Sequence, residues 1–330
     1  MNWDEDLSPS PEELARSGSL EELYARLARI PIGPGWNKPT PSLWDAPRKS
    51  LVPYRWRYVQ GRGALEAAGR LINTELAERR NLILANPAGD GYATTRSMIT
   101  AYQMIMPGER ARSHRHMPNA LRLVLESEPG CYTVVNGKRL EMEPGDVLLT
   151  PNWSWHGHGN ESESNGYWAD YLDVPLVHLL EPMFFEPHPK GFELDAPIVH
   201  DDPNIFRWQD TLDRLDAAPA TPASRYATEI ALGDPALETM GLSMMRLEPG
   251  TSTERHRTTA GNIYTVAHGS GVTEIDGQSF DWQHGDVIAV PAWLPHSHRA
   301  NEVSVLFRVS DEPAMQKLGF LRSETASSPH

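Results

Sequence analysis

The segment PGERARSHRHMPNALRLVLE, residues 107–126, recurs as PGTSTERHRTTAGNIYTVAH at residues 249–268. A second segment follows each copy in the same order: MEPGDVLLTPNWSWHGHGN at 142–160 and WQHGDVIAVPAWLPHSHRAN at 282–301. Matching order and nearly equal spacing indicate an internal repeat, in which each copy is one structural unit. The sequence therefore predicts two homologous domains in one chain.

Both copies consist of short β-prone runs separated by turn residues. NLILANP, SMITAYQMIMPG, LRLVLE, CYTVVNG and DVLLTP are divided by Gly, Pro, Asn and Asp, which is typical of an antiparallel sandwich or barrel. Helical spacing is confined to residues 1–30, to 62–80 and to the run WQDTLDRLDAA, while the proline-rich residues 31–53 indicate an extended arm. We expect an all-β-dominated chain with N-terminal helices and an arm over 1–80, β domains over 81–180 and 226–315, a linker over 181–225, and a flexible tail over 316–330.

The composition excludes several classes of partner. Forty-four acidic against thirty basic residues give a net charge of −14, which repels nucleic acid and anionic membranes. The chain contains no apolar run near the roughly 20 residues that cross a bilayer, and its first residues are acidic where a signal peptide is basic. Cys131 is the single cysteine, so a disulfide within the chain is excluded. We expect a globular cytoplasmic protein without nucleic-acid or membrane partners.

Three histidines of the first copy have the spacing of a metal site. Side chains alternate between the faces of a strand, so His114 and His116 project from one side and can bind one ion together. His156 follows a turn and the strand VLLTP, which could return alongside that pair in an antiparallel barrel. The alternative is that these are ordinary barrel histidines with satisfied hydrogen bonds. A correctly spaced third imidazole favours metal.

The spacing resembles the two motifs of the cupins, which are a Gly, five residues and His-x-His, then a Gly, five residues, Pro-x-Gly, two residues and His. Here Gly108 precedes His114 and His116, while Gly145, Pro151 and His156 fit the second motif, with Trp153 replacing its glycine. The resemblance implies two double-stranded β-helix (jelly-roll) barrels, a bicupin. The glutamate of many cupins falls at Ala120 or Leu121, so the ligands would be three neutral imidazoles, which leave positions open on the ion.

The second copy retains only part of this motif. His256 and His296 are present, but Thr258 occupies the position of the remaining imidazole. Two histidines and a hydroxyl make a poor metal site. We therefore expect one metal ion per chain, in the first barrel, with the second barrel serving packing and oligomerisation.

Arg122 lies in the apolar run LRLVLE with the same even parity as His114 and His116, so it faces the same barrel interior if the strand stays regular past Asn119. A guanidinium facing a barrel interior needs an anion. That anion is either a substrate carboxylate or an internal acid such as Glu126. His158, two residues after His156, is a rival fourth ligand, a catalytic acid or base beside the metal, or a surface residue, and we favour the acid–base role.

More specifically, the sequence resembles the bicupin gentisate 1,2-dioxygenases and their salicylate and 1-hydroxy-2-naphthoate relatives. ERRNLILANP, the HRH run with ALRLVLE, the block from YTVVNG to HGHGN, and YWADYLDVPLV carry the resemblance. It implies ring opening between C1 and C2 of a hydroxybenzoate by O2, on one Fe(II) per chain, in a homotetramer. The residues it implies are His114, His116 and His156 as ligands, and Arg122, His158, Gln103, Arg80 or Arg79, Trp168 and Asp173 near the substrate.

The resemblance leaves the substrate open. Gentisate is the default, and salicylate, a 5-substituted (halo or nitro) salicylate and 1-hydroxy-2-naphthoate are alternatives. More distant possibilities are a redox-neutral metal cupin, such as an isomerase or decarboxylase, and a binding bicupin without activity. Of the arginine pair we prefer Arg80, and the barrel core accounts equally well for Trp168.

Overall fold

The computed structural model describes residues 8–77, 79–193, 195–219, 227–234 and 236–325. The chain divides into two compact units, residues 1–48 and 49–330. The first unit contains helices α1 (Pro11–Ala15) and α2 (Leu20–Leu27), each begun by a serine, Ser10 or Ser19, whose side chain accepts the backbone N–H three residues later. The expected N-terminal helix is therefore present, as two short helices rather than one.

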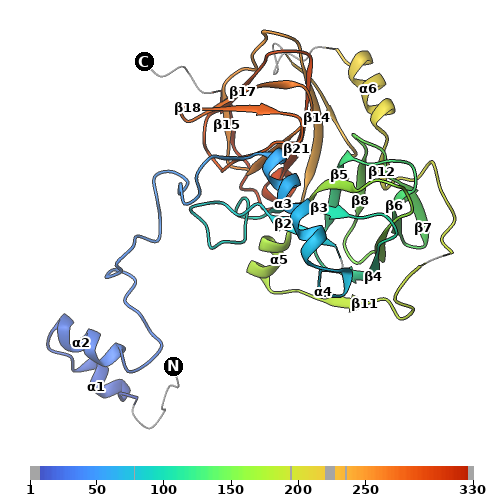
Figure 1. The fold of residues 1–330 in the computed structure, drawn as a ribbon. Helices are drawn as coiled ribbons and strands as arrows, with labels where there is room; N and C mark the ends of the chain where they lie inside the picture. Colours follow the sequence, from blue (N-terminus) through green and yellow to red (C-terminus); the bar gives the residue numbers. More distant parts are fainter. Residues whose placement is uncertain (1–7, 78, 194, 220–226, 235, 326–330) are drawn as a thin grey trace. The chain divides into compact units, whose positions relative to one another are not determined.

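In the second unit, one barrel is built from a six-stranded and a five-stranded antiparallel sheet (Figure 1). The six-stranded sheet has the order β12-β8-β5-β10-β3-β2, and the five-stranded sheet has the order β11-β4-β9-β6-β7. The strands are β2 (Arg80–Ile83), β3 (Ile99–Ile105), β4 (Arg110–His116), β5 (Ala120–Glu126), β6 (Cys131–Val135), β7 (Lys138–Glu141), β8 (Val147–Thr150), β9 (His156–Asn160), β10 (Gly166–Leu172), β11 (Phe185–Pro187) and β12 (Ile205–Phe206).

The second barrel repeats this architecture with the orders β1-β19-β16-β21-β14-β13 and β18-β17-β20-β15-β22. Its strands are β1 (Tyr54–Trp56), β13 (Ala227–Ala231), β14 (Gly241–Leu247), β15 (His256–Thr258), β16 (Asn262–His268), β17 (Ser270–Ile275), β18 (Gln278–Gln283), β19 (Val287–Val290), β20 (His296–Ala300), β21 (Ser304–Ser310) and β22 (Ser323–Thr325). The unit also contains helices α3 (Tyr58–Leu71), α4 (Thr74–Ala77), α5 (Val174–Leu180), α6 (Trp208–Ala217) and α7 (Glu312–Lys317). The predicted β fold with two repeated barrels is confirmed.

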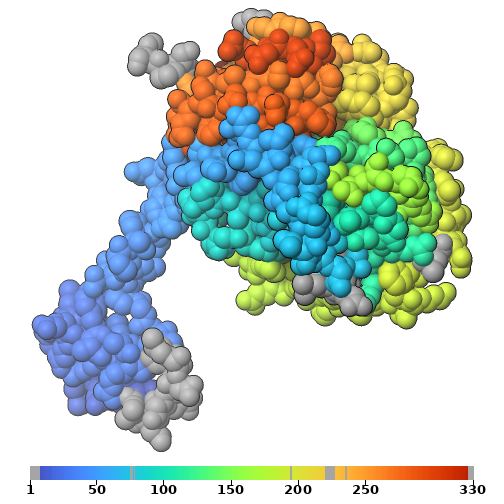
Figure 2. Space-filling view, in the orientation of Figure 1, coloured from blue at the N-terminus to red at the C-terminus, as the bar shows by residue number. Residues whose placement is uncertain are grey.

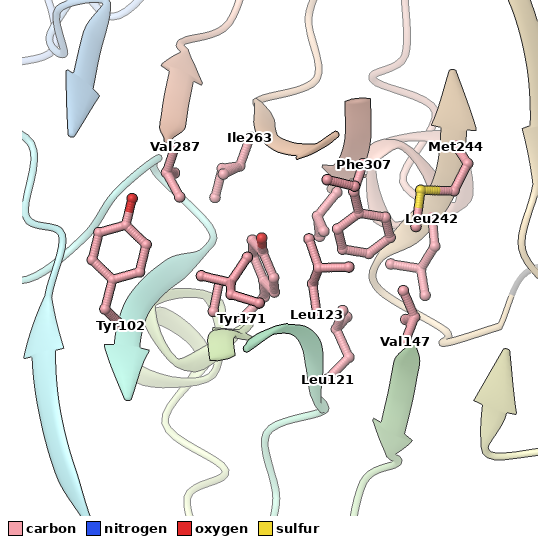
Figure 3. Close-up of a cluster of buried hydrophobic side chains, with 14 of the residues drawn as sticks. Tyr102, Leu121, Leu123, Val147, Tyr171, Leu242, Met244, Ile263, Val287 and Phe307 are labelled. Carbon is pink, nitrogen blue, oxygen red and sulfur yellow. The ribbon is translucent and has the colours of Figure 1, made fainter. Parts of the chain in front are cut away.

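The two six-stranded sheets pack against each other and share one hydrophobic core (Figure 3). Leu121 and Leu123 of β5 face this core, together with Phe307 of β21 from the other barrel. The alternate residues of β5, Arg122 and Val124, therefore face the interior of the first barrel. Burial on both faces explains the nearly continuous apolar run of β5, and Arg122 belongs to the face that lines the interior of the first barrel.

Each barrel also receives a strand and a helix that precede the other barrel in sequence. Strand β1 pairs with β19 of the second barrel, and β12 pairs with β8 of the first. Helix α3 follows β1 and α6 follows β12, and Figure 2 shows the chain around α3 (blue) lying across the boundary between the barrels. The expected arm over 1–80 and linker over 181–225 are thus partly integral to the barrels. Strands of two or three residues are too short to leave a periodic signal.

The expected flexible tail over 316–330 also differs from the structure. Residues 323–325 form β22, which pairs with β15 of the second barrel. Residues 326–330 lie outside the described part of the chain. Among the described helices, none combines the length and hydropathy of a membrane-spanning segment.

Candidate active site

The three predicted metal-binding histidines come together at the edge between β4 and β9. His114 lies opposite His156 in the register of this strand pair, and His116 follows on the same face of β4. The ligand atoms of the three side chains all lie within 4.8 Å of one another. The ring centroids are 4.4 Å apart for His114 and His156 and 4.8 Å apart for His116 and His156.

Backbone carbonyl groups fix the same tautomer in all three rings. The Nδ1 atoms of His114, His116 and His156 lie 3.3, 2.8 and 3.0 Å from the carbonyl oxygens of Arg112, Pro118 and Ser154. A carbonyl only accepts, so each Nδ1 carries the proton and each Nε2 keeps its lone pair. Three neutral imidazoles whose ligand atoms lie within 4.8 Å of one another fit a divalent transition-metal ion.

Burial keeps these imidazoles neutral. It lowers the pKa of His114 to about 3, with a further contribution from the positive charge of Arg79. Burial likewise lowers the pKa of His116 and His156, and in His156 the neighbouring histidines add to the effect. The unprotonated form that a metal requires is therefore the stable form near neutral pH.

Trp153 has a backbone φ of 61°, in the left-handed region, and its counterpart Trp293 has a φ of 64°. This conformation explains the glycine of the cupin motif, because only glycine adopts it without strain. Both tryptophans donate their N–H to the carbonyl of the position that carries the second ligand, His116 in the first barrel and Thr258 in the second. The strained turn between β8 and β9 is thus held against β4, the strand that carries His114 and His116.

Arg122 lies inside the first barrel and is 1% exposed. Its Nη1 donates to Thr133 Oγ1 (2.8 Å) and to His158 Nδ1 (2.6 Å), while its Nε lies 3.7 Å from Asp170 Oδ1. Burial lowers the pKa of Arg122 to about 10, against the opposing charge of Asp170, so the group stays cationic near neutral pH. Glu126 is not its partner, because Arg62 and Tyr58 bind that carboxylate.

Asp170 was missed by sequence reasoning. It lies opposite Arg122 in the β5–β10 pair and accepts a hydrogen bond from Gln103 Nε2 at 2.7 Å. The sequence signal that could have identified Asp170 is its position two residues after Trp168, which places both side chains on the same face of β10. Burial raises the pKa of Asp170, and the charge of Arg122 opposes that shift.

Five polar side-chain atoms of Arg122, Asp170 and nearby residues are buried and have no hydrogen-bond partner within the described chain. Buried polar atoms in folded proteins are normally paired. A cluster of unpaired ones on converging side chains indicates that a polar ligand, or water in its place, completes the set. The atoms are Arg79 Nε, Gln103 Oε1, Arg122 Nε, Trp168 Nε1 and Asp170 Oδ1.

The two arginines of the predicted pair, Arg79 and Arg80, have different surroundings. Arg80 is buried, forms an ion pair with Glu109 (2.6 Å) and donates to the carbonyl of Ile72, while its Nε has no hydrogen-bond partner within the described chain. The charge of Arg79, in contrast, contributes to lowering the pKa of His114, after burial. Arg79 is therefore the arginine of the pair that lies near the histidines.

Of the remaining predicted residues, His158 and Trp168 lie beside Arg122, and Asp173 lies at the start of α5. His158 contacts Arg122 and lies 5.5 Å, ring to ring, from the fully buried Trp168, which belongs to the core of the first barrel. Burial, and then the charge of Arg122, lowers the pKa of His158 well below its usual value. Asp173 instead lies at the start of α5, where its Oδ2 accepts from Asn119 and Thr239 and its Oδ1 has no hydrogen-bond partner within the described chain.

The second barrel keeps the scaffold of the site with different side chains. The rings of His256 and His296 are 4.3 Å apart, close to the spacing of their counterparts. Tyr264 donates to or accepts from His296 Nε2 at 3.0 Å. It stands where the first barrel has Arg122, and Arg308 faces it where the first barrel has Asp170. Within the described residues, one group of three potential metal ligands is found, the triad of the first barrel.

Comparison with known proteins shows that this chain is similar to several of them over nearly its whole length. A model of the cupin domain family matches residues 101–175 and 243–308. A 5-aminosalicylate 1,2-dioxygenase from Comamonas sp is 34% identical over 94% of this chain and 91% of that protein. A gentisate 1,2-dioxygenase from Aquipseudomonas alcaligenes is 32% identical over 94% and 98%. The structure of salicylate 1,2-dioxygenase from Pseudoaminobacter salicylatoxidans with gentisate matches with a TM-score of 0.86, at 27% identity over 95% of each chain.

Proposed function

Because the chain belongs to the bicupin family of ring-cleaving gentisate, salicylate and 1-hydroxy-2-naphthoate 1,2-dioxygenases, we propose that it opens gentisate between C1 and C2, using one Fe(II) ion per chain. The observation that carries the proposal is the buried, cationic Arg122 beside three neutral imidazoles with free Nε2 atoms. A cation and an open metal face side by side suit a substrate with adjacent carboxylate and hydroxyl groups.

His114, His116 and His156 would hold the iron through Nε2. Bound Fe(II) would accept the carboxylate and hydroxyl oxygens of the substrate as ligands and would activate O2, chemistry that the chain's own side chains do not supply. Three protein ligands leave the remaining coordination positions to the two reactants.

The surrounding side chains orient the substrate. The Arg122 guanidinium neutralises the carboxylate, and its unpaired Nε and the nearby Arg79 Nε are the donors that such an anion would complete. Arg122 Nη1 lies 2.6 Å from His158 Nδ1 and 3.1 Å from its Nε2. This contact holds the imidazole where it would exchange a proton with the substrate hydroxyl. The unpaired Oε1 of Gln103 and Oδ1 of Asp170 offer acceptors for a further hydroxyl, such as the para hydroxyl of gentisate.

Salicylate, a 5-substituted salicylate and 1-hydroxy-2-naphthoate are the alternatives. A relative named for 5-aminosalicylate is 34% identical to this chain, which supports a 5-substituted salicylate as the second candidate. Gln103 and Asp170 also suit an amino group at that ring position, because both offer acceptors. A redox-neutral isomerase or decarboxylase would show no dependence on O2.

We also propose a homotetramer in the cytoplasm. The exposed apolar side chains Trp36, Leu43 and Trp44 of the proline-rich arm support assembly through that arm. The single cysteine fits a reducing compartment.

Oxygen uptake by anaerobically Fe(II)-reconstituted protein would test the proposal, with gentisate, 5-aminosalicylate, salicylate, 5-halo- and 5-nitrosalicylate and 1-hydroxy-2-naphthoate in parallel. The expected result is the highest kcat/KM for gentisate and no uptake by His116→Ala. A higher value for another substrate would reassign the substrate. Conversion of a substrate without O2 would overturn the dioxygenase proposal.

A further inference from the structure

Each barrel ends in a short edge strand that lies along its ligand-bearing strand. In the first barrel, β11 pairs with β4, so that Phe185, Glu186 and Pro187 lie opposite His116, Arg115 and His114. In the second barrel, β22 pairs with β15, and Ser323, Glu324 and Thr325 lie opposite Thr258, Arg257 and His256. We call β11 and β22 the strap strands. One comes from the inter-barrel segment and the other from the C-terminal segment, yet their registers correspond residue by residue.

The same set of side chains fastens both strap strands. Arg115 Nη2 lies 2.6 Å from Glu186 Oε2, and the guanidinium lies over the rings of Trp153 (4.3 Å) and Trp155 (4.5 Å). In the second barrel, Arg257 Nε donates to Glu324 at 2.6 Å and lies over Trp293 at 4.6 Å. We call each Arg–Glu–Trp set a latch. Its tryptophan is in both cases the residue with positive φ that ties down the ligand strand.

The latch decides where the side chains of β11 point. Residues opposite each other in an antiparallel pair share a face, so Phe185 lies on the face of His116 and His114, while Glu186 lies on the outer face with Arg115. The ring of Phe185 is 5.2 Å from the ring of His114. Phe185 is nevertheless 62% exposed, so this ring stands at the solvent side of the metal histidines. Phe184 points the other way, with its ring 6.2 Å from Trp153.

We propose that Phe185 forms the outer wall of the substrate site and contacts the aromatic ring of the bound substrate, and that Glu186 and Arg115 are positioning residues that hold it there. The inference rests on the proposed function, because it requires an aromatic substrate on the histidine triad. An exposed phenylalanine beside buried imidazoles gains contact area only when a flat apolar ligand covers it. The second barrel has Ser323 in the same position, so the latch there holds a strap strand without an aromatic wall.

The test compares matched pairs of variants. Phe185→Ala removes the proposed wall, and Phe184→Ala removes an equally exposed neighbouring ring that faces away. The expected result for Phe185→Ala is a KM for gentisate, or for the substrate found to be preferred, raised by about three- to tenfold, with kcat within about twofold. Anaerobic equilibrium binding of that substrate should weaken by the same factor. Phe185→Tyr, which keeps the ring, should restore both values, and Phe184→Ala should change neither.

Glu186→Gln and Glu324→Gln test the latch. Both break the same kind of Arg–Glu contact, but only Glu186 lies beside the triad. Glu186→Gln should raise KM in the same direction as Phe185→Ala and speed hydrogen exchange at the amide of His188, which donates to the Ser113 carbonyl across the strap. Glu324→Gln should leave KM unchanged.

The outcomes separate this inference from the proposed function. Normal turnover with equal KM values for Phe185→Ala, Phe184→Ala and wild type would overturn the aromatic wall and leave the dioxygenase assignment intact. Equal effects of Glu186→Gln and Glu324→Gln on KM would overturn the positioning role of the latch. A wild-type protein that binds and converts no aromatic hydroxycarboxylate would overturn both the proposed function and the wall.

Discussion

At the scale of single residues, the site depends on a cation held away from water. Arg122 has an acid near its Nε but no hydrogen-bond partner for that atom in the described chain. It can therefore neutralise an incoming carboxylate without first breaking a strong ion pair. The first prediction concerns this group.

Arg122→Met should lower kcat/KM by at least about a hundredfold, since a charge-assisted hydrogen bond to a buried group contributes about 1.5–3 kcal/mol and the carboxylate would lose its orientation as well. Steady-state oxygen uptake measures the change, and iron content measured on the same samples should stay equal to wild type. Arg112→Met, on the exposed face of the ligand strand, is the control. Equal activity of Arg122→Met and the control would contradict the role.

The left-handed turn at Trp153 gives the second prediction. Because only glycine adopts positive φ without strain, Trp153→Gly should be more stable than Trp153→Ala, by about 1 kcal/mol. At Trp155, whose φ is not positive, the order should reverse. Urea unfolding of the four variants measures both differences. The same order at the two positions would show that strain does not control this turn.

Strand parity predicted much of the site from sequence, and its failures have a physical cause. The even positions of His114 and His116 were sufficient to place them on one face of β4. Parity does not carry over to Arg122, because residues 117–119 separate β4 from β5. Parity cannot choose between Arg79 and Arg80, because the strand begins at Arg80 and the residue before it is free of the alternation. Asp170 has the right parity but no motif, so only its pairing with Arg122 across β5 and β10 reveals it.

At the scale of elements, one aspartate in each copy anchors a helix from elsewhere in the chain. Asp146 accepts the N–H of Trp208 at the start of α6 (2.8 Å), and Asp286 accepts the N–H of Tyr58 at the start of α3 (2.9 Å). Gly145 and Gly285 precede them, and a Cβ at either would clash with the ring of Trp208 or Tyr58. The Gly-Asp turn of the repeat is thus also the docking point of a strand–helix unit.

The third prediction follows from this equivalence. Asp146→Ala and Asp286→Ala should each lower the free energy of unfolding by about 2–3 kcal/mol, because each leaves two buried or partly buried backbone donors unpaired. Asp213→Ala, on the exposed face of α6, should change it by less than about 0.5 kcal/mol. Urea unfolding measures all three. A small effect at Asp286 alone would mean that α3 is held by its apolar face instead.

The longer elements were predictable and the short ones were not. β3, β5 and β10 each span seven residues, long enough for alternation and β-branched composition to show. β1, β11, β12 and β22 have two or three residues. Their existence depends on main-chain pairing with a strand that is already in place, and composition does not encode that.

At the scale of the whole molecule, the two barrels are joined by their shared core. Tyr102, Leu121 and Leu123 of one barrel and Ile263 and Phe307 of the other pack in a single buried cluster (Figure 3). Tyr171 and Thr265 also form a buried hydrogen bond between the barrels, at 2.5 Å. The fold therefore predicts that neither barrel is stable alone, which explains why the second barrel persists although it lacks the third histidine.

The fourth prediction tests this coupling. Phe307→Ala should lower the free energy of unfolding by about 3–5 kcal/mol through the cavity it leaves, and calorimetry should still show one transition for residues 49–330. Hydrogen exchange of β10 in the first barrel and β16 in the second should accelerate together. Acceleration in the second barrel alone would contradict a shared cooperative core.

Ring cleavage at the triad of the first barrel requires that both atoms of O2 enter the aromatic substrate. Turnover of the preferred substrate by the Fe(II)-reconstituted protein under ¹⁸O₂, with the product trapped before its new ketone exchanges with water, tests it most directly by mass spectrometry. We expect a ring-opened product that carries both oxygen atoms of one O2 molecule, and no such product from His116→Ala. A product that carries one labelled atom or none would contradict ring cleavage by a dioxygenase at this site.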